Sequence, residues 1–467
     1  MPHYIPRPLC RAYHYLLALV GAALYRFPAR SLTVIGITGT KGKTTVSELI
    51  TAILEEAGYT VALANGVRFK ISSWEERNLS RMTMPGRFFL QRFLRRALSR
   101  GATHAVIEMT SEGAAQHRHR FLALDALVFT NLAPEHIESH GSYEAYRDAK
   151  LSIARSLANS PKRQRVMVAN ADDEAGSLFL AAVRAVRSAA SNGASPARPC
   201  PYSLKDAEPY EIKNDGIAFT FDGHLITSPL VGVFNLSNIL AAATLAKGIS
   251  IETEIIACAI ASFAGVPGRM EYIREGQTFD VIVDYAHTPD SLRAVYQFLR
   301  ESIFNFQFSI FKQIPNSKIQ KFKTSNDDTK KLICVLGATG GGRDKWKRPE
   351  MGRIAAEYCD SIILTDEDSY DEPPEKIIEE IKSGAINNKF PVTSDQLRVP
   401  GNQLPITSPQ IIIDRHLAIR TALGIARRGD VVVITGKGSD PSICGPRGTK
   451  VAWSDAAVVR QELARLR

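Results

Sequence analysis

The 467-residue sequence has few cysteines and no long hydrophobic run near its amino terminus. Its six cysteines lie far apart and form no Cys-x-x-Cys pair, a pattern that predicts neither a disulfide framework nor a zinc site and indicates buried thiols in a reducing cytosol. The apolar stretch at residues 15–25 is too short to span a bilayer, which takes about 20 apolar residues. We therefore expect a cytoplasmic protein.

Acidic residues are fewer than basic ones. The sequence has 48 aspartates and glutamates and 58 lysines and arginines, which gives a net charge of +10. This excess suits nucleic acid, a membrane surface or polyanionic nucleotide ligands, so charge alone excludes none of these partners. The length corresponds to roughly two to three domains. A hydrophobic fraction of 45% is sufficient for sizeable cores, and we expect a globular protein.

Residues 31–49, SLTVIGITGTKGKTTVSEL, have the pattern of a strand, a glycine-rich turn and a helix that begins at Lys43. Glycines let successive backbone N–H groups curl around a phosphate, the lysine adds positive charge, and the Thr44 hydroxyl is suited to bind Mg²⁺. The strict P-loop pattern is not met, because isoleucine takes the place of its first glycine. The stretch nevertheless predicts a site for the phosphates of ATP.

Residues 1–30 precede this strand and combine arginines with the apolar stretch. Signal peptides have a similar order of basic and apolar regions, but export would separate an ATP site from its ATP. We expect a helix that packs on the first domain. A peripheral membrane helix with a basic flank stays open as an alternative.

Strands and helices alternate after the first helix. Expected strands lie at 61–64, 104–109 and 126–130, and an expected helix at 87–99. This order predicts an α/β fold, with a P-loop ATPase domain on a mostly parallel, doubly wound sheet. Because ligands of such sheets bind beyond the carboxyl ends of the strands, Glu108 and His136 are candidate Mg²⁺ ligands.

Eight segments follow one another in a fixed order: TGTKGKTT, EMTSEGAAQHR, NLAPEHIESHGSYEAYRDAK, VFNLSNILAA, GRMEY, DYAHTPDSL, GGGRDKWKRPEMG and GKG. In order and spacing they resemble the Mur ligases over nearly everything from residue 31 onward. DYAHTP and GGGRDKWKRPEMG are similar to the branch that adds the third amino acid of the peptidoglycan stem. The resemblance implies a central ATP-binding domain at 31–267 and a carboxyl-terminal Rossmann-like α/β domain at 268–467.

For ATP, the resemblance implies that the glycine-rich turn binds the phosphates and that Asn235 and Asn238 lie on the adenine side. The turn residues are Gly39, Thr40, Lys41, Gly42, Lys43, Thr44 and Thr45. As an alternative, an asparagine in front of a helix acts as an N-cap, and the two roles are compatible.

For Mg²⁺, the resemblance implies ligation by Thr44, Glu108 and His136. Lys150 falls where the family has a carbamylated lysine, and addition of CO₂ turns an ammonium group into a metal-binding carboxylate. The implied catalytic residues are Lys43, Glu108, His136, Lys150 and Arg269.

For the muramoyl-peptide acceptor, the matching residues are Thr83, Pro85, Thr110, Ser111, Gln116 and Arg118. An arginine such as Arg118 is able to pair a phosphate or carboxylate through two hydrogen bonds. We expect no functional role for four nearby histidines, which are His104, His117, His119 and His140.

Residues 265–270, GVPGRM, have the composition of a hinge between domains. Arg269 would be the family arginine that closes onto the γ-phosphate. A strand at 279–283 leads to Asp284, Tyr285 and His287, which the resemblance places beside the nucleotide. Later strands are expected at 332–336, 361–365, 411–414 and 430–435.

The incoming amino acid is expected to meet Arg343 and Lys345, and after the next strand Asp366 and Asp368. Family members selective for diaminopimelate have Asp-Asn-Pro-Arg in that second place, whereas this chain has the acidic segment TDEDSYD. Loss of the arginine removes a clamp for a second carboxylate, and an acidic cluster suits an amine, so lysine or another basic amino acid is favoured. Gly436 and Asp440, in GKGSD, are expected in the same region.

Residues 302–330 match no family motif, and we expect a surface insertion loop with a short strand or helix. Members of this branch bind the UDP end of their substrate with an amino-terminal domain, and no segment of this sequence resembles that domain. We therefore expect other surfaces to hold that end, or a different or lipid-linked muramoyl acceptor.

The implied reaction is ATP-dependent formation of an amide bond between UDP-N-acetylmuramoyl-L-Ala-D-Glu and an amino acid, through an acyl phosphate. We expect small-molecule substrates, no nucleic-acid partner and a monomer. One alternative is a ligase of the same fold that acts on a lipid-linked or glutamyl acceptor. Another is a P-loop protein that binds nucleic acid, which requires basic residues clustered on one face, whereas here they are scattered along the sequence.

Overall fold

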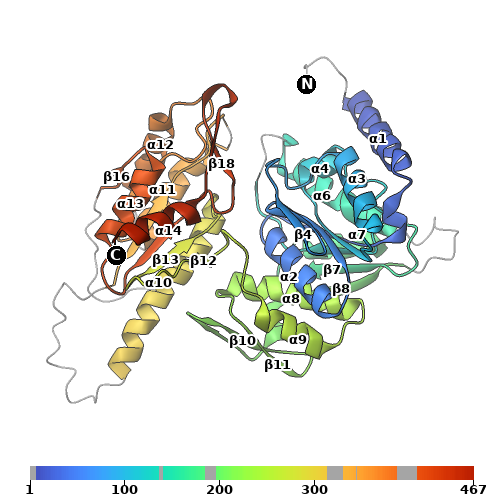
Figure 1. Cartoon of the computed structure of the whole chain (residues 1–467), viewed down its shortest axis with the longest axis horizontal. Coiled ribbons are helices and arrows are strands. Elements are labelled where there is room, and N and C mark those ends of the chain that lie inside the picture. The colour runs from blue at the N-terminus through green and yellow to red at the C-terminus, as the bar shows by residue number, and fades with distance from the viewer. Residues whose placement is uncertain are drawn as a thin grey trace. The chain divides into compact units, whose positions relative to one another are not determined.

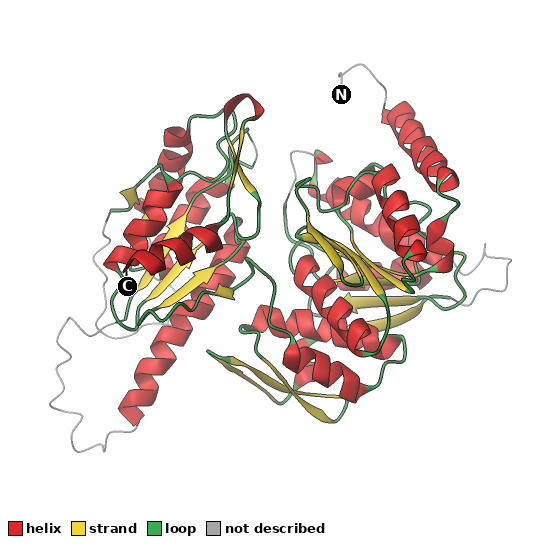
Figure 2. Ribbon diagram, viewed as in Figure 1, coloured by secondary structure: helices red, strands yellow, loops and turns green. Residues whose placement is uncertain are grey.

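The computed structural model describes residues 7–135, 140–184, 196–312, 330–342, 344–386 and 408–466, and the backbone alone at 7–8 and 304–312. The chain forms two compact units, residues 1–265 and 266–467. In each unit, helices cover a central β-sheet (Figures 1 and 2). Three predicted features, which are His136, Arg343 and most of the insertion at 302–330, lie outside the described residues.

The first unit is organised around an eight-stranded sheet in the order β4-β3-β2-β5-β1-β6-β7-β8. Its strands are β1 (Thr33–Thr38), β2 (Val61–Ala64), β3 (Arg68–Ile71), β4 (Trp74–Arg77), β5 (His104–Glu108), β6 (Ala126–Phe129), β7 (Val166–Asn170) and β8 (Arg198–Tyr202). Six neighbouring strands of this sheet run parallel, namely β2, β5, β1, β6, β7 and β8. Strands β3 and β4 add an antiparallel edge. The predicted mostly parallel sheet is confirmed.

Helices cover both faces of this sheet, so its strands are apolar on both sides. Along β1, Ile35 and Ile37 join one buried cluster with α2 and α8, while Val34 joins the other with α3 and α6. The helices of the unit are α1 (Arg7–Leu24), η1 (Pro28–Ser31), α2 (Lys43–Glu56), α3 (Arg87–Ser99), α4 (Ser111–Ala115), α6 (Tyr143–Ala158), α7 (Gly176–Arg184), η2 (Leu204–Ala207), α8 (Val233–Gly248) and α9 (Thr253–Ser262).

A small antiparallel sheet, which the sequence did not lead us to expect, lies in the same unit. Its strands are β9 (Tyr210–Lys213), β10 (Gly216–Phe221) and β11 (His224–Ser228). Phe219 and Ile226 face each other across β10 and β11 and enter the same core as α8 and α9. The sheet thus extends the hydrophobic support of the helix that carries Asn235 and Asn238.

The second unit has a six-stranded sheet in the order β12-β13-β17-β14-β15-β16, parallel except for β12. Its strands are β12 (Glu271–Tyr272), β13 (Asp280–Val283), β14 (Leu332–Leu336), β15 (Ser361–Leu364), β16 (Gln410–Ile411) and β17 (Val431–Ile434), and β18 (Ser442–Cys444) pairs with β19 (Lys450–Ala452) in a separate hairpin. Its helices are α10 (Pro289–Lys312), α11 (Lys347–Tyr358), α12 (Pro374–Ile386), α13 (Arg415–Ile425), η4 (Pro446–Gly448) and α14 (Asp455–Leu466). The predicted α/β fold is confirmed here as well.

The amino-terminal stretch forms α1, which packs against α3 as expected for a helix docked on the first unit. Among the described residues, no helix is long and apolar enough to cross a membrane. The start of the insertion at 302–330 continues α10 as far as Lys312.

The expectation of free thiols throughout is wrong, because Cys334 and Cys359 form a disulfide. Cys334 lies in β14 and Cys359 directly follows α11. The disulfide therefore joins the strand to the end of this helix, 25 residues further along the chain. Spacing alone did not reveal the pair, since neither cysteine belongs to a recognisable motif.

Candidate active site

The glycine-rich turn between β1 and α2 leaves no room for side chains at two of its positions. Gly39 has φ +150°, and a Cβ atom there would lie 1.9 Å from Thr130 Oγ1. Gly42 has φ +80°, and its Cβ would lie 2.2 Å from Asn238 Oδ1. The turn is therefore restricted to glycine at both positions.

Neighbouring loops hold this turn in place. Asn131 accepts hydrogen bonds from the Thr40 N–H through its carbonyl and from the Lys41 N–H through its side chain, both at 2.8 Å. The Thr40 hydroxyl and the Tyr146 hydroxyl lie 2.9 Å apart. Asn131 and Tyr146 were not among the predicted site residues, because contacts across 90 and 106 positions leave no local signal in the sequence.

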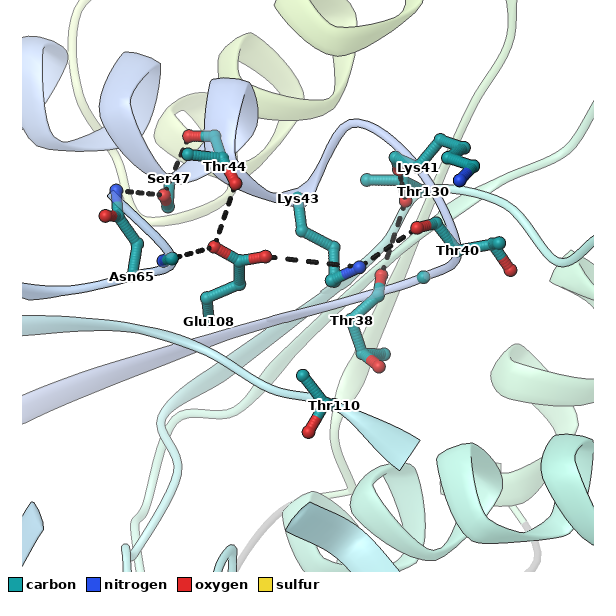
Figure 3. A network of polar contacts seen from close by, with 12 residues as sticks. Thr38, Thr40, Lys41, Lys43, Thr44, Ser47, Asn65, Glu108, Thr110 and Thr130 are labelled. Carbon is teal, nitrogen blue, oxygen red and sulfur yellow. Dashed lines mark hydrogen bonds and ion pairs between the residues drawn. The ribbon is translucent and has the colours of Figure 1, made fainter. Parts of the chain in front are cut away.

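Glu108, at the end of β5, lies directly under the start of α2 (Figure 3). Its Oε2 atom accepts hydrogen bonds of 3.0 Å from the Thr44 hydroxyl and from the Gly66 N–H. Its Oε1 atom is 4.0 Å from Lys43 Nζ, which also donates to the carbonyl of Thr40 at 3.0 Å. The structure thus brings together a carboxylate, a hydroxyl and an ammonium group beside the glycine-rich turn.

Lys150, on α6, is buried and reaches the same turn. Its Nζ atom donates to the Gly39 carbonyl at 2.5 Å and lies 4.8 Å from the centre of the Tyr146 ring. Burial is the main reason that the pKa of Lys150 is held well below its usual value, and the positive charge of Lys43 lowers it further. Both effects favour the uncharged form of the amine.

Residues on either side of the predicted ligand His136 also converge on the site. Glu135 accepts from Lys41 Nζ at 3.0 Å. His140 Nε2 lies 3.1 Å from the hydroxyl of the buried residue Ser111. His140 thus lies next to a predicted acceptor residue.

The predicted acceptor residues lie after β5, on and after α4, and just before α3. Thr110 is the N-cap of α4 and accepts from the Gly113 N–H at 3.1 Å. Arg118 donates to the Met84 carbonyl and to the side-chain oxygen of Gln116, at 2.8 Å to the latter. Both hydrogen-bond acceptors are uncharged, while Glu112 acts on the Arg118 charge only electrostatically.

Two further acceptor residues lie near the same carboxylate. A Cβ atom at Gly66 would lie 3.3 Å from Thr83 Oγ1 and 3.7 Å from Glu108 Oε2, which places Thr83 close to Glu108. Pro85 follows in the same turn and is buried.

Asn235 and Asn238 are buried in the first turns of α8. The N-cap of this helix is Gly232, and no side chain caps it, so the N-cap interpretation of the two asparagines is wrong. Asn235 instead donates to the Val231 carbonyl at 2.9 Å and accepts from Asn238 Nδ2 at 3.2 Å. Because Asn238 Oδ1 faces Gly42, it belongs to the wall of the glycine-rich turn.

In the second unit, Arg269 and the residues after β13 form one cluster. The Arg269 guanidinium stacks 4.1 Å from the centre of the Tyr285 ring and donates to Ser439 Oγ at 3.4 Å. Asp284 accepts from the N–H groups of Met270 and Ala286, both at 2.7 Å. His287 packs edge-on against Tyr285, with ring centres 4.6 Å apart.

Several predicted ligands of the amino acid form ion pairs with other side chains of the second unit. Asp368 accepts from Lys437 Nζ at 3.0 Å, and Asp440 is 3.1 Å from the same atom. Lys345 lies 3.5 Å from Glu372. These three predicted amino-acid ligands are thus engaged in ion pairs within the unit.

Glu367, in contrast, has a carboxylate oxygen without a hydrogen-bond partner among the described residues. Its Oε1 atom accepts from Thr339 Oγ1 at 3.0 Å, while Oε2 is buried, unpaired and directed at Gly436, where a Cβ would lie 2.3 Å away. Burial raises the pKa of Glu367, and burial likewise raises that of Asp366, which accepts from the Glu367 N–H at 2.8 Å. We did not predict Glu367 as a ligand, although its segment was the one singled out.

No group of three or more His, Cys, Asp or Glu side chains suited to a metal occurs among the described residues, which exclude His136. The hard oxygen donors Thr44 Oγ1 and Glu108 Oε2 lie 3.0 Å apart beside the turn. These donors fit Mg²⁺, which binds proteins through one or two oxygen ligands together with substrate phosphates.

Comparison with known proteins shows the origin of this arrangement. Residues 37–246 match the Mur ligase middle domain, and residues 268–307 and 317–438 match the Mur ligase glutamate ligase domain. The chain is 34% identical to the UDP-N-acetylmuramyl-tripeptide synthetase of Roseiflexus sp. (strain RS-1), over 99% of this chain and 85% of that protein. It is 36% identical to the UDP-N-acetylmuramoyl-L-alanyl-D-glutamate--2,6-diaminopimelate ligase of Gloeobacter violaceus, over 96% of this chain and 81% of that protein.

Solved structures agree. A UDP-N-acetylmuramoyl-L-alanyl-D-glutamate--2,6-diaminopimelate ligase superposes with a TM-score of 0.57 at 27% identity, over 93% of this chain and 79% of the other. Folylpolyglutamate synthase of Mycobacterium tuberculosis shares the fold, with a TM-score of 0.65 at 15% identity and coverage of 90% and 92%. This chain belongs to the Mur ligase family of ATP-dependent, amide-bond-forming ligases.

Proposed function

We propose that this chain adds a third amino acid to UDP-N-acetylmuramoyl-L-Ala-D-Glu through an acyl phosphate, with residues 31–267 as the ATP-binding domain and residues 268–467 as the domain that receives the amino acid. The family relationship supports ATP and Mg²⁺ as reactants. The observation that carries the proposal is the convergence of Lys43, Thr44, Glu108 and Lys150 on one glycine-rich turn.

The turn is suited to hold the phosphates of ATP. The N–H groups at the start of α2 and the Lys43 ammonium supply positive charge where the γ-phosphoryl group would be transferred. Thr44 and Glu108, together with His136, are the proposed Mg²⁺ ligands, and the ion would neutralise charge that develops on the phosphoryl oxygens. Arg269, Asp284 and His287 are proposed as further nucleotide ligands.

Lys150 is proposed to act as a carbamate. Only an unprotonated amine reacts with CO₂, and burial favours that form of the Lys150 amine by lowering its pKa. The resulting carboxylate would lie beside Gly39, within the phosphate-binding turn, and would supply a further hard oxygen ligand.

The acceptor is proposed to bind at Thr83, Thr110, Ser111 and Arg118. The described hydrogen-bond partners of Arg118 are uncharged, so its guanidinium is suited to pair with a carboxylate or phosphate of the acceptor. Holding the terminal carboxylate near the phosphoryl group would then make the phosphorylation step effectively intramolecular.

The amino acid is proposed to place its side-chain amine at Glu367, whose Oε2 atom has no hydrogen-bond partner in the described part of the chain, rather than at the ion-paired Asp368. Lys437, Arg415 and Lys347 act on Glu367 electrostatically, yet its Oε2 atom accepts no hydrogen bond from the described residues, so an ammonium group would supply the missing donor. This supports lysine or another diamino acid as the substrate, and Tyr370 lies in the segment where an arginine would select diaminopimelate.

The test is amino-acid-dependent phosphate release from ATP, with UDP-N-acetylmuramoyl-L-Ala-D-Glu as acceptor and with lysine, ornithine and diaminopimelate offered one at a time. Release with one of them, confirmed by mass spectrometry of the amide product, supports the proposal. Absence of release with all three, while ATP binding is retained, would contradict the proposed acceptor. The matched control omits the acceptor.

A further inference from the structure

Helix α1 turns a stripe of large apolar side chains outward. The stripe consists of side chains that are each 46–65% exposed, Leu9, Tyr13, Leu16, Val20 and Leu24. Their spacing of three or four positions places them on one side of the helix, where they form a continuous apolar face. Single exposed apolar residues are common, but a stripe along a whole helix indicates something that covers it.

The opposite side of α1 is made of small residues and faces the protein. Ala18, Gly21 and Ala22 are buried, and a Cβ atom at Gly21 would lie 3.4 Å from the Phe88 ring of α3. Figure 1 shows α1 alongside α3 at the edge of the unit. The outward stripe is therefore held in place and does not result from a loosely docked helix.

A polar contact fixes the rotation of α1 as well. His14 Nδ1 lies 3.0 Å from Arg87 Nη2 at the start of α3, and the Tyr15 ring packs edge-on against His117. Rotation of α1 to bury its large residues would break both contacts. The exposed stripe is thus a property of the docked helix.

The charge of this face has one sign. Residues 1–47 contain no aspartate or glutamate, and neither do residues 77–107, which include α3, while the two segments together contain eleven arginines. Exposed examples are Arg92 and Arg95 on α3, which lie on the same side of that helix as Phe88. Folding brings these two arginine-rich segments side by side, because α1 packs against α3.

We propose that the face formed by α1 and α3 docks on an anionic bilayer surface. In this arrangement α1 lies in the plane of the membrane with Leu9, Leu16 and Leu24 in the boundary between headgroups and acyl chains, and the arginines contact lipid phosphates. An apolar stripe with a basic surround is the composition of helices that lie in this interface.

Charge and composition argue against other occupants. A second copy of the chain would bring arginines against arginines, which repel each other. A nucleic acid would pair with the arginines but would leave the leucine stripe in water. An anionic bilayer is complementary to both parts of the face.

Co-flotation of the purified full chain with lipid vesicles tests the proposal. Vesicles of phosphatidylglycerol and phosphatidylcholine are expected to bind the protein at least about tenfold more tightly than pure phosphatidylcholine, because arginines near an anionic surface add attraction that salt screens. Equal binding to both kinds of vesicle, or binding to neither, would overturn it.

Substitutions distinguish membrane binding by the apolar stripe of α1 from non-specific adsorption of the protein to vesicles. The double variant Leu16→Glu/Val20→Glu is expected to lose vesicle binding by about tenfold or more, since both side chains are exposed and enter the acyl boundary. Leu225→Glu is the matched control, because Leu225 is 74% exposed on β11, away from α1, and is expected to bind like the wild type. Circular dichroism confirms that each variant is folded.

A second pair of variants tests the basic part of the face. Arg92→Gln/Arg95→Gln is expected to weaken binding to anionic vesicles by several fold, whereas Arg428→Gln/Lys450→Gln, which removes the same charge from exposed positions of the second unit, is expected to have little effect. Equal losses in both pairs would overturn the assignment of this face. A dimer that Leu16→Glu/Val20→Glu dissociates, or binding to duplex DNA, would also overturn it if vesicles are not bound.

Discussion

The Lys150 amine donates a 2.5 Å hydrogen bond to the carbonyl of Gly39 in the glycine-rich turn between β1 and α2. The contact crosses 111 positions of the sequence and ties α6 to the end of β1. Because Lys150 is buried with its pKa well below the usual value, it is more than a surface cation near a phosphate site. Its position makes its chemical state measurable through activity.

Replacement of Lys150 by alanine is expected to lower turnover by about 10²–10³-fold, the range typical of losing one preorganised electrostatic group. If the residue acts as a carbamate, formate or acetate should restore part of the activity by occupying the vacated carboxylate position. Phosphate release is measured with and without these acids. Lys205→Ala, at an exposed lysine, is the control and should need no rescue. Normal turnover of the Lys150 variant without added acid would contradict the carbamate.

The Glu108 carboxylate is predicted to be needed as a charge and not only as a hydrogen-bond acceptor. Glu108→Gln keeps the size of the side chain and an oxygen for Thr44, but removes the negative charge that would hold Mg²⁺. Turnover should fall by about 10²-fold or more, and the Mg²⁺ concentration for half-maximal activity should rise. Glu112→Gln, at an exposed glutamate on α4, should change neither value. Unchanged Mg²⁺ dependence in Glu108→Gln would remove Glu108 from the ligand set.

Much of the fold was predictable, because strands that are buried on both faces of a sheet have short, continuous apolar sequences. The predicted strands at 61–64 and 332–336 and the helix at 87–99 have the same bounds in the structure. The sheet of β9, β10 and β11 was not predicted, because its strands are short and partly exposed and carry a weak apolar signal.

The site was predictable only where a motif marks it. Lys43, Thr44 and Glu108 were expected together, and the structure places them together, while their roles stay predictions. Asn131 and Tyr146 hold the turn through contacts across about a hundred positions, which no local pattern encodes. Glu367 was missed for another reason, since its unpaired oxygen becomes visible only after Asp368 is seen to be taken by Lys437.

The Cys334–Cys359 disulfide predicts a defined thiol count. The other four cysteines, Cys10, Cys200, Cys258 and Cys444, all lie in the described part of the chain and form no disulfide. Protein denatured without reductant should therefore give four thiols in an assay with Ellman's reagent, and six after reduction. Cys334→Ala/Cys359→Ala should lower the free energy of unfolding by about 2–4 kcal/mol, because the cross-link no longer restricts the unfolded chain. Six thiols before reduction would show that the bond does not form in solution.

Glu367 is predicted to set the pH dependence of amino-acid binding. Burial raises its pKa, so its carboxylate becomes protonated at a higher pH than an ordinary glutamate, whose pKa is 4.5. A protonated Glu367 cannot pair with an ammonium group, so the KM for the diamino acid should rise as the pH falls through this raised pKa while the KM for ATP stays nearly constant. Glu367→Gln should have a KM about tenfold higher that no longer varies with pH in this range, the loss expected for one charged hydrogen bond. Glu379→Gln, on the exposed side of α12, is the control and should retain the wild-type profile. If Glu367→Gln kept the wild-type KM and its pH dependence, the amine would have to bind elsewhere.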